Sequence, residues 1–215
     1  LFRKEETKKT PLLPDPIMSL NYIIGYSAKT CTNVIYNSHG DYGTNPSLYK
    51  DNDINPSKKH IYFCSGPNLI KFDPINIKQK FFLGHSKPIS NFITACKGEI
   101  IFSNQEGVNS IIRVWKTSDC SCYKMLTTPF DKLKAIAENK SSKLLCTVGN
   151  EQNRESIIIW NIENLDNITA YIRQSIPTPI NNIKFSPFED IILVSCGKEN
   201  IKFWRIKNDH LSGKA

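Results

Sequence analysis

The chain has 215 residues, 40% of them hydrophobic, which is enough for a folded core and argues against a disordered chain. It contains no run of eighteen apolar residues, and the charged stretch 1–10 lacks the apolar region of a secretory signal, so we predict neither a membrane span nor secretion. The formal net charge of +8 favours an acidic partner, although the basic residues are dispersed along the chain and many should be ordinary solvated positions.

The first 59 residues fall into three segments of different composition. Residues 1–19 form a basic and polar tail, and residues 20–37 begin with an apolar run that leads into the rest of the chain. Residues 38–59 hold Gly, Asn, Asp, Pro and Ser with few apolar side chains, which is typical of a long loop. The repeated part of the chain is therefore expected to span residues 60–215.

An aromatic residue recurs at a nearly constant interval, each time at the end of a short apolar strand. Trp115, Trp160 and Trp204 are separated by 45 and 44 residues, and a step of 43 residues back from Trp115 reaches Phe72. This interval is the length of one four-stranded propeller blade. Further β-rich runs precede the aromatic strands, at 60–64, 89–95, 99–102, 133–137, 143–148, 180–185 and 190–194.

These elements predict an all-β fold, a partial WD-repeat β-propeller of about three and a half to four blades. No helical period persists over ten residues, which argues against helical repeats of similar length. The expected blades are 60–84, 85–127, 128–174 and 175–215, and Ala215 is expected to fall before the last strand of the fourth. A propeller of about seven such blades needs on the order of 300 residues, so we expect a fragment of a larger tandem propeller.

The recurring aromatic side chains have an expected structural role, because they fill the wedge between neighbouring blades. Gly84 and His85 fit the turn that passes from one blade to the next, where the imidazole can bond to a neighbouring strand rather than act in catalysis. Only one Gly-His pair occurs, and no Asp follows any of the tryptophans. The polar networks of regular blades are therefore expected to be incomplete.

Sequence motifs for catalysis and cofactor binding are missing. The chain has no glycine-rich phosphate loop, no Gly-x-Ser-x-Gly elbow and no His-Glu-x-x-His. Cys120 and Cys122 form the only close cysteine pair, without two further ligands at a spacing that suits a metal. Seven cysteines without a secretory signal indicate reduced, mostly buried thiols in the cytosol. We predict no enzyme activity, cofactor, metal or small-molecule substrate.

Residues 20–26, Leu-Asn-Tyr-Ile-Ile-Gly-Tyr, resemble the hydrophobic motif of the echinoderm microtubule-associated protein-like family, known as the HELP motif. The segment 31–33, Cys-Thr-Asn, is similar to the one that follows this motif in the family, and the later repeats keep the family's order. The motif residues that carry the resemblance are Leu20, Tyr22, Gly25 and Tyr26, with Tyr22 where Trp is usual. The resemblance implies a tubulin-binding tandem propeller whose motif helps to seat the two propellers together.

Three functions are consistent with these features. The first is a microtubule-associated protein of the cytoplasm and cytoskeleton that contacts tubulin through one rim of the propeller. The second is a structural WD-repeat protein of the axoneme or centriole, and the third is a general adaptor, such as a ubiquitin-ligase substrate receptor or an RNA-associated scaffold. Binding of nucleic acid is not favoured, because no platform of Arg and aromatic residues is visible. The strand register places four candidate tubulin contacts on one rim: Lys87, Lys132, Arg154 and Lys198.

Overall fold

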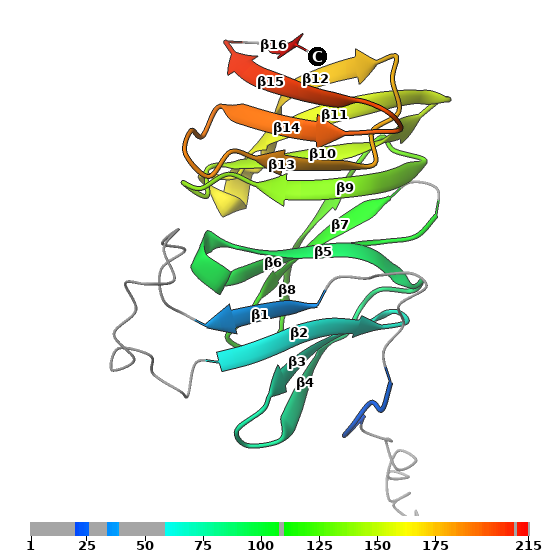
Figure 1. Ribbon diagram of the computed structural model, residues 1–215. Helices are drawn as coiled ribbons and strands as arrows, with labels where there is room; N and C mark the ends of the chain where they lie inside the picture. Colours follow the sequence, from blue (N-terminus) through cyan, green and yellow to red (C-terminus); the bar gives the residue numbers. More distant parts are fainter. Residues whose placement is uncertain (1–19, 26–33, 39–58, 108–109, 209, 215) are drawn as a thin grey trace, which may run out of the picture.

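The computed structural model describes residues 20–25, 34–38, 59–107, 110–208 and 210–214, which form four antiparallel sheets of four strands each. Each sheet is a meander in which consecutive strands pair (Figure 1). The all-β propeller fold predicted from the aromatic interval is confirmed. The described residues contain two short 3₁₀ turns, Cys96–Gly98 and Leu165–Asn167, and no α-helix.

We refer to the four sheets as blades 1 to 4. Blade 1 consists of β1 (Ile35–Ser38), β2 (Lys59–Ser65), β3 (Asn68–Asp73) and β4 (Lys78–Phe82). Blade 2 consists of β5 (Ile89–Ala95), β6 (Ile100–Gln105), β7 (Ile111–Lys116) and β8 (Cys122–Thr127). Blade 3 consists of β9 (Lys132–Glu138), β10 (Leu144–Glu151), β11 (Arg154–Asn161) and β12 (Thr169–Ile176). Blade 4 consists of β13 (Asn182–Phe185), β14 (Ile192–Cys196), β15 (Ile201–Lys207) and β16 (His210–Lys214).

The blades stack face to face, and their first strands lie next to one another along one side of the stack. There β5 contacts both β1 and β9, and β9 contacts β13 (Figure 1). The apolar residues between successive blades form three core clusters, and each cluster contains one tryptophan that faces the preceding blade. Trp115, Trp160 and Trp204 are at most 7% exposed and stand on the third strand of their blades.

Blade 4 is complete, which corrects the expectation that the chain ends before its last strand. β16 pairs with β15 along its whole length. Only Leu211 on this strand is a buried apolar residue, so the hydrophobic pattern of the sequence is too weak to predict it. A Cβ atom at Gly213 would lie 2.7 Å from the Trp204 ring, which explains why a strand opposite the tryptophan needs glycine there.

The far face of blade 4 is open. Ile157 and Ile159 on the corresponding face of blade 3 are fully buried by blade 4. The equivalent residues of blade 4, Ile201 and Phe203, are 60% and 58% exposed. Cys196 lies on the same open face, so this thiol is exposed although its apolar strand predicts burial. The arrangement is that of a partial propeller.

Gly197 permits the turn after β14 to lie close to the segment that precedes β13. This contact leads to a testable prediction about stability. A Cβ atom at position 197 would lie 2.1 Å from the backbone oxygen of Pro179, which precedes β13. We expect Gly197→Ala to lower the free energy of unfolding by roughly 1–3 kcal/mol, because the backbone must move to relieve the clash. Urea unfolding measures the loss. The neighbouring exposed substitution Lys198→Ala is the control, and an equal loss in both variants would contradict the packing argument.

Candidate functional site

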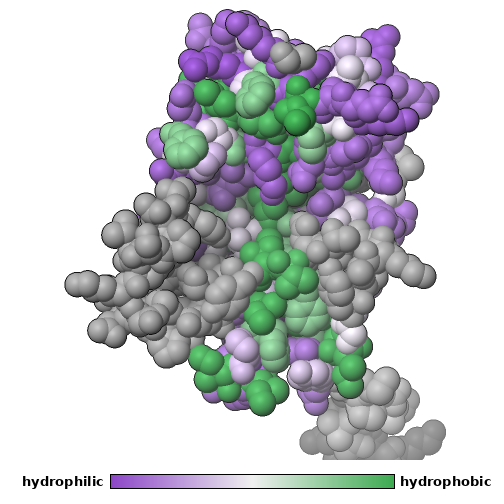
Figure 2. Space-filling view, viewed as in Figure 1, coloured by the Kyte–Doolittle hydropathy of each residue, from purple (hydrophilic) through white to green (hydrophobic). Residues whose placement is uncertain are grey.

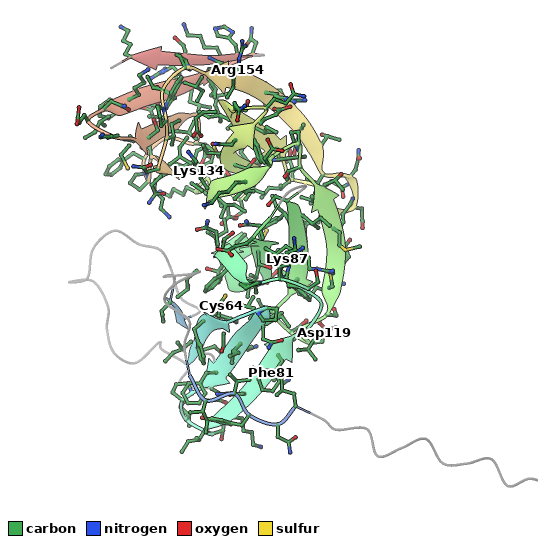
Figure 3. The ribbon with its side chains drawn as sticks, turned by 90° about the vertical axis from the view of Figure 1, so that its right-hand side faces the viewer. Cys64, Phe81, Lys87, Asp119, Lys134 and Arg154 are labelled. Atoms are coloured by element: carbon green, nitrogen blue, oxygen red, sulfur yellow. The ribbon has the colours of Figure 1, made fainter. Side chains whose placement is uncertain are left out.

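The four candidate contacts lie on one edge of the stack, where the turns between second and third strands and the connections between blades emerge. We call this edge the upper rim. Lys87 precedes β5, Lys132 begins β9, Arg154 begins β11 and Lys198 follows β14. Figure 3 shows Lys87 and Arg154 at different levels of the stack. None of the four cations forms an ion pair with a described residue, and all four side chains are exposed.

Carboxylates accompany the upper-rim cations. Asp131 precedes Lys132, Glu155 follows Arg154, and Glu199 follows Lys198. The side chain of Lys87 lies over Gly107 in the turn of the neighbouring strand pair. The upper rim is therefore a mixed surface of both charge signs, and its attraction for an acidic partner depends on which side chains reach outward.

A polar pocket opens on the upper rim between blades 3 and 4. It is lined by Asn150, Glu155 and Arg154 together with the connection that carries Pro177 and Pro179. The side chain of Glu155 forms an ion pair with Lys134, while its other oxygen, Oε2, has no hydrogen-bond partner among the described residues. The Oδ1 atom of Asn150 likewise has no hydrogen-bond partner within the described ranges. The pocket thus presents two acceptors that water or a donor group of a partner can satisfy.

A chain of hydrogen bonds runs through the boundary between blades 1 and 2. Trp115 Nε1 donates to Ser103 Oγ at 2.7 Å, and the same hydroxyl lies 2.7 Å from His85 Nε2. His85 Nδ1 lies 3.1 Å from Gln105 Oε1, an atom that also accepts the backbone N–H of Ser86. Since the tryptophan can only donate, a consistent assignment has Ser103 donating to Nε2 and protonated Nδ1 donating to Gln105.

These hydrogen bonds hold His85 as a neutral structural residue. The pKa of its imidazole is lowered to about 4, mainly by burial, with an opposing contribution from the Gln105 bond and a further lowering contribution from the nearby Arg113 guanidinium. Gly84 adopts a positive φ of 155° and packs over Trp115 and Arg113. His85 is identifiable from the sequence, but Gln105 is not. The equivalent position in blades 3 and 4 holds glycine, at Gly149 and Gly197.

The tryptophans of blades 3 and 4 have shorter polar networks. Trp160 Nε1 donates to Thr147 Oγ1 at 2.8 Å, and Trp204 Nε1 donates to Ser195 Oγ at 2.8 Å. No histidine extends either bond, because the Gly-His pair occurs once in the chain.

The N-terminal motif lies against the first blade. The backbone N–H of Ile23 donates to Gln79 Oε1 at 2.9 Å, and the Gln79 amide donates back to the Ile23 oxygen at 3.1 Å. Phe72 stands on the face of β3 that corresponds to the tryptophan positions, and with Phe63 it lines an apolar pocket of about 450 Å³ beneath the motif. The motif therefore borders the face on which a preceding blade would pack. Leu20, Tyr22 and Gly25 are exposed to solvent, and Tyr26 lies outside the described residues.

Groups that could bind a metal do not converge in the described part of the chain. No cluster of three or more His, Cys, Asp or Glu side chains suited to a metal occurs among these residues. Cys120 is buried in the turn before β8, whereas Cys122 is exposed on that strand. Nor does any helix within the described ranges have the length and apolar character needed to cross a membrane.

Comparisons with known proteins identify relatives of the WD-repeat kind. No family model matches the chain. It is 25% identical to WD repeat-containing protein 90 of Xenopus tropicalis over 210 residues, which cover 96% of the chain and 10% of that protein. It is 25% identical to Centriole proteome protein 16 of Chlamydomonas reinhardtii over 94% of the chain and 10% of that protein. The chain thus spans about a tenth of the length of these relatives.

Two further similarities concern a microtubule-associated protein and the fold. Echinoderm microtubule-associated protein-like 2 of Rattus norvegicus is 22% identical over 93% of the chain and 29% of its own length. A chain in the crystal structure of the Mitotic Checkpoint Complex superposes with a TM-score of 0.61 and 18% identity, covering 73% of this chain and 48% of that one. The relatives support a WD-repeat protein, and the structural similarity supports the fold alone.

Proposed function

We propose that the chain is part of a non-catalytic, microtubule-associated WD-repeat protein that binds tubulin through the surface of its propeller. The observation that supports this function is similarity over more than nine-tenths of the chain both to a microtubule-associated protein and to a centriole protein. Relatives of two cytoskeletal kinds thus match almost the same span of sequence. A span of more than nine-tenths of the chain includes most of the four blades.

The binding mechanism is electrostatic and depends on shape. The cations of the upper rim, Lys87, Lys132, Arg154 and Lys198, face an acidic surface of tubulin, and salt weakens the association by screening. Because adjacent carboxylates limit the net charge of the rim, the contacts must be directional and not a general attraction between opposite charges.

Co-sedimentation with microtubules over a salt series tests this function. We expect charge reversal at all four upper-rim cations to weaken binding by about tenfold or more, because each lost contact is replaced by repulsion. The matched control reverses the charge of four exposed lysines outside the upper rim, at Lys78, Lys80, Lys116 and Lys207, which changes the net charge equally. Unchanged binding after reversal at the upper rim would overturn the proposed contacts, and no binding by the native chain would overturn the function.

A structural role in the centriole or axoneme is the second candidate, favoured by the similarity to Centriole proteome protein 16. The two candidates differ in where the protein resides. A fluorescent tag on the endogenous protein that stays at centrioles or axonemes, without labelling cytoplasmic microtubules, would favour the structural role. Labelling along cytoplasmic microtubules would favour the first candidate.

A further inference from the structure

The first strands of the four blades border a groove on the side opposite the outer strands. It is lined by residues of β1, β5, β9 and β13 and by the turns that follow β5, β9 and β13, with a volume of about 370 Å³. Figure 2 shows apolar residues running down the middle of this face. We call this recess the inner groove. Its size falls within the range of sites that bind small ligands or short peptide segments.

Apolar side chains line the middle of the inner groove. Ile35 comes from β1, Ile93 from β5 and Phe185 from β13, and all three are only partly buried. Ala137 of β9 lies among them. These residues stand on separate blades, so the apolar lining exists only when the blades are stacked.

Three lysines surround this lining. Lys97 lies in the turn after β5, Lys140 in the turn after β9, and Lys184 on β13. All three are exposed, and none forms an ion pair with the described part of the chain. The backbone at Lys97 has a positive φ of 55°, which is uncommon for a residue with a side chain.

The acidic residues near the inner groove are already engaged. Glu138 accepts the backbone N–H of Cys96 at 2.8 Å, and burial raises the pKa of its carboxyl group. Asp190 accepts the backbone N–H of Ser141 at 3.0 Å. Three lysines and one carboxylate, Glu138, line the groove, so the net charge of its lining is positive.

We infer that the inner groove binds an extended acidic segment of a protein partner, in which carboxylates alternate with apolar side chains. The carboxylates pair with Lys97, Lys140 and Lys184, and the apolar side chains pack on Ile35, Ile93 and Phe185. The successive side chains of an extended chain point in opposite directions. One set can therefore pack on the apolar lining while the other set reaches the lysines beside it. The mainly aliphatic lining favours a peptide over single-stranded nucleic acid, whose bases stack on aromatic rings. Only the identity of the protein that supplies the segment rests on the proposed function.

Fluorescence anisotropy with a short labelled peptide of alternating glutamate and leucine tests the inner groove directly. We expect the triple substitution Lys97→Glu, Lys140→Glu and Lys184→Glu to weaken binding by about tenfold or more. The matched control, Lys78→Glu with Lys116→Glu and Lys207→Glu, changes the net charge equally at exposed lysines outside both candidate sites and should alter binding by less than about twofold. Equal weakening in both variants would show general charge attraction and overturn the inference, as would no binding by the native chain.

Two further measurements separate the parts of this inference. A peptide of alternating glutamate and serine should bind more weakly than the leucine peptide, and equal affinity would refute a contribution from the apolar lining. A carbodiimide joins carboxylates to nearby amines, so on the unaltered chain it should couple the leucine peptide to Lys97, Lys140 or Lys184; coupling confined to other lysines would overturn the site. These assays contain no tubulin, so their failure is distinct from a failure to bind microtubules.

Discussion

Replacing Trp115 by alanine is expected to lower the free energy of unfolding by about 4 kcal/mol, the typical cost of removing a buried large aromatic side chain. The indole is fully buried between blades 1 and 2. It contacts the Phe82 ring edge-on at a centroid distance of 5.7 Å and the His85 ring at 5.8 Å. Its loss leaves a cavity at the wedge and also removes the donor to Ser103. Urea unfolding of the chain measures the change.

Trp115→Phe separates packing from hydrogen bonding in this result. Phenylalanine keeps an aromatic ring in the wedge but has no N–H for Ser103, so we expect a loss smaller than that of alanine, about 1–3 kcal/mol. Equal losses in the two variants would show that the polar network and not the filled volume stabilises this boundary. Trp204→Ala should cost less than Trp115→Ala, because Trp204 is 5% exposed whereas Trp115 is fully buried.

The propeller could be predicted from the sequence because its repeat is carried by large side chains at fixed positions. Each tryptophan lies on a third strand and faces the preceding blade, so a constant interval between tryptophans indicates a constant blade length. β16 escaped prediction because it holds a single buried apolar residue, Leu211. Strands that contribute little to the core leave little signal in the hydrophobic pattern.

The candidate sites differ in how much of them the sequence reveals. Strand alternation alone places Lys87, Lys132, Arg154 and Lys198 on one edge, because every second turn of a meander emerges on the same side. The inner groove depends instead on how separate blades stack, and its residues extend from Ile35 to Pro187. The role of Gln105 could not be predicted from the sequence either, because it follows from the position of the His85 ring and not from a motif.

Lowering the pH from 6.5 to 4 is expected to remove about 3 kcal/mol of stability through His85 alone, at 1.36 kcal/mol per unit of pKa difference. The imidazole has a pKa of about 4 in the folded chain because it is buried, against an ordinary value of 6.5. Between these values the unfolded chain binds the additional proton. The contribution of His85 is therefore complete above pH 6.5 and is lost progressively as the pH falls toward 4. Urea unfolding at a series of pH values measures the loss.

His85→Gln and Gln105→Glu distinguish this effect from the general acid sensitivity of carboxylates. The first variant cannot take up the proton, so its stability should fall less steeply than that of the native chain between pH 6.5 and 4. In the second, a carboxylate replaces the amide that accepts from Nδ1, which favours the imidazolium, raises the pKa of His85 and should also flatten the curve. If both variants followed the native pH profile, His85 would not be the buried neutral group that the hydrogen-bond chain requires.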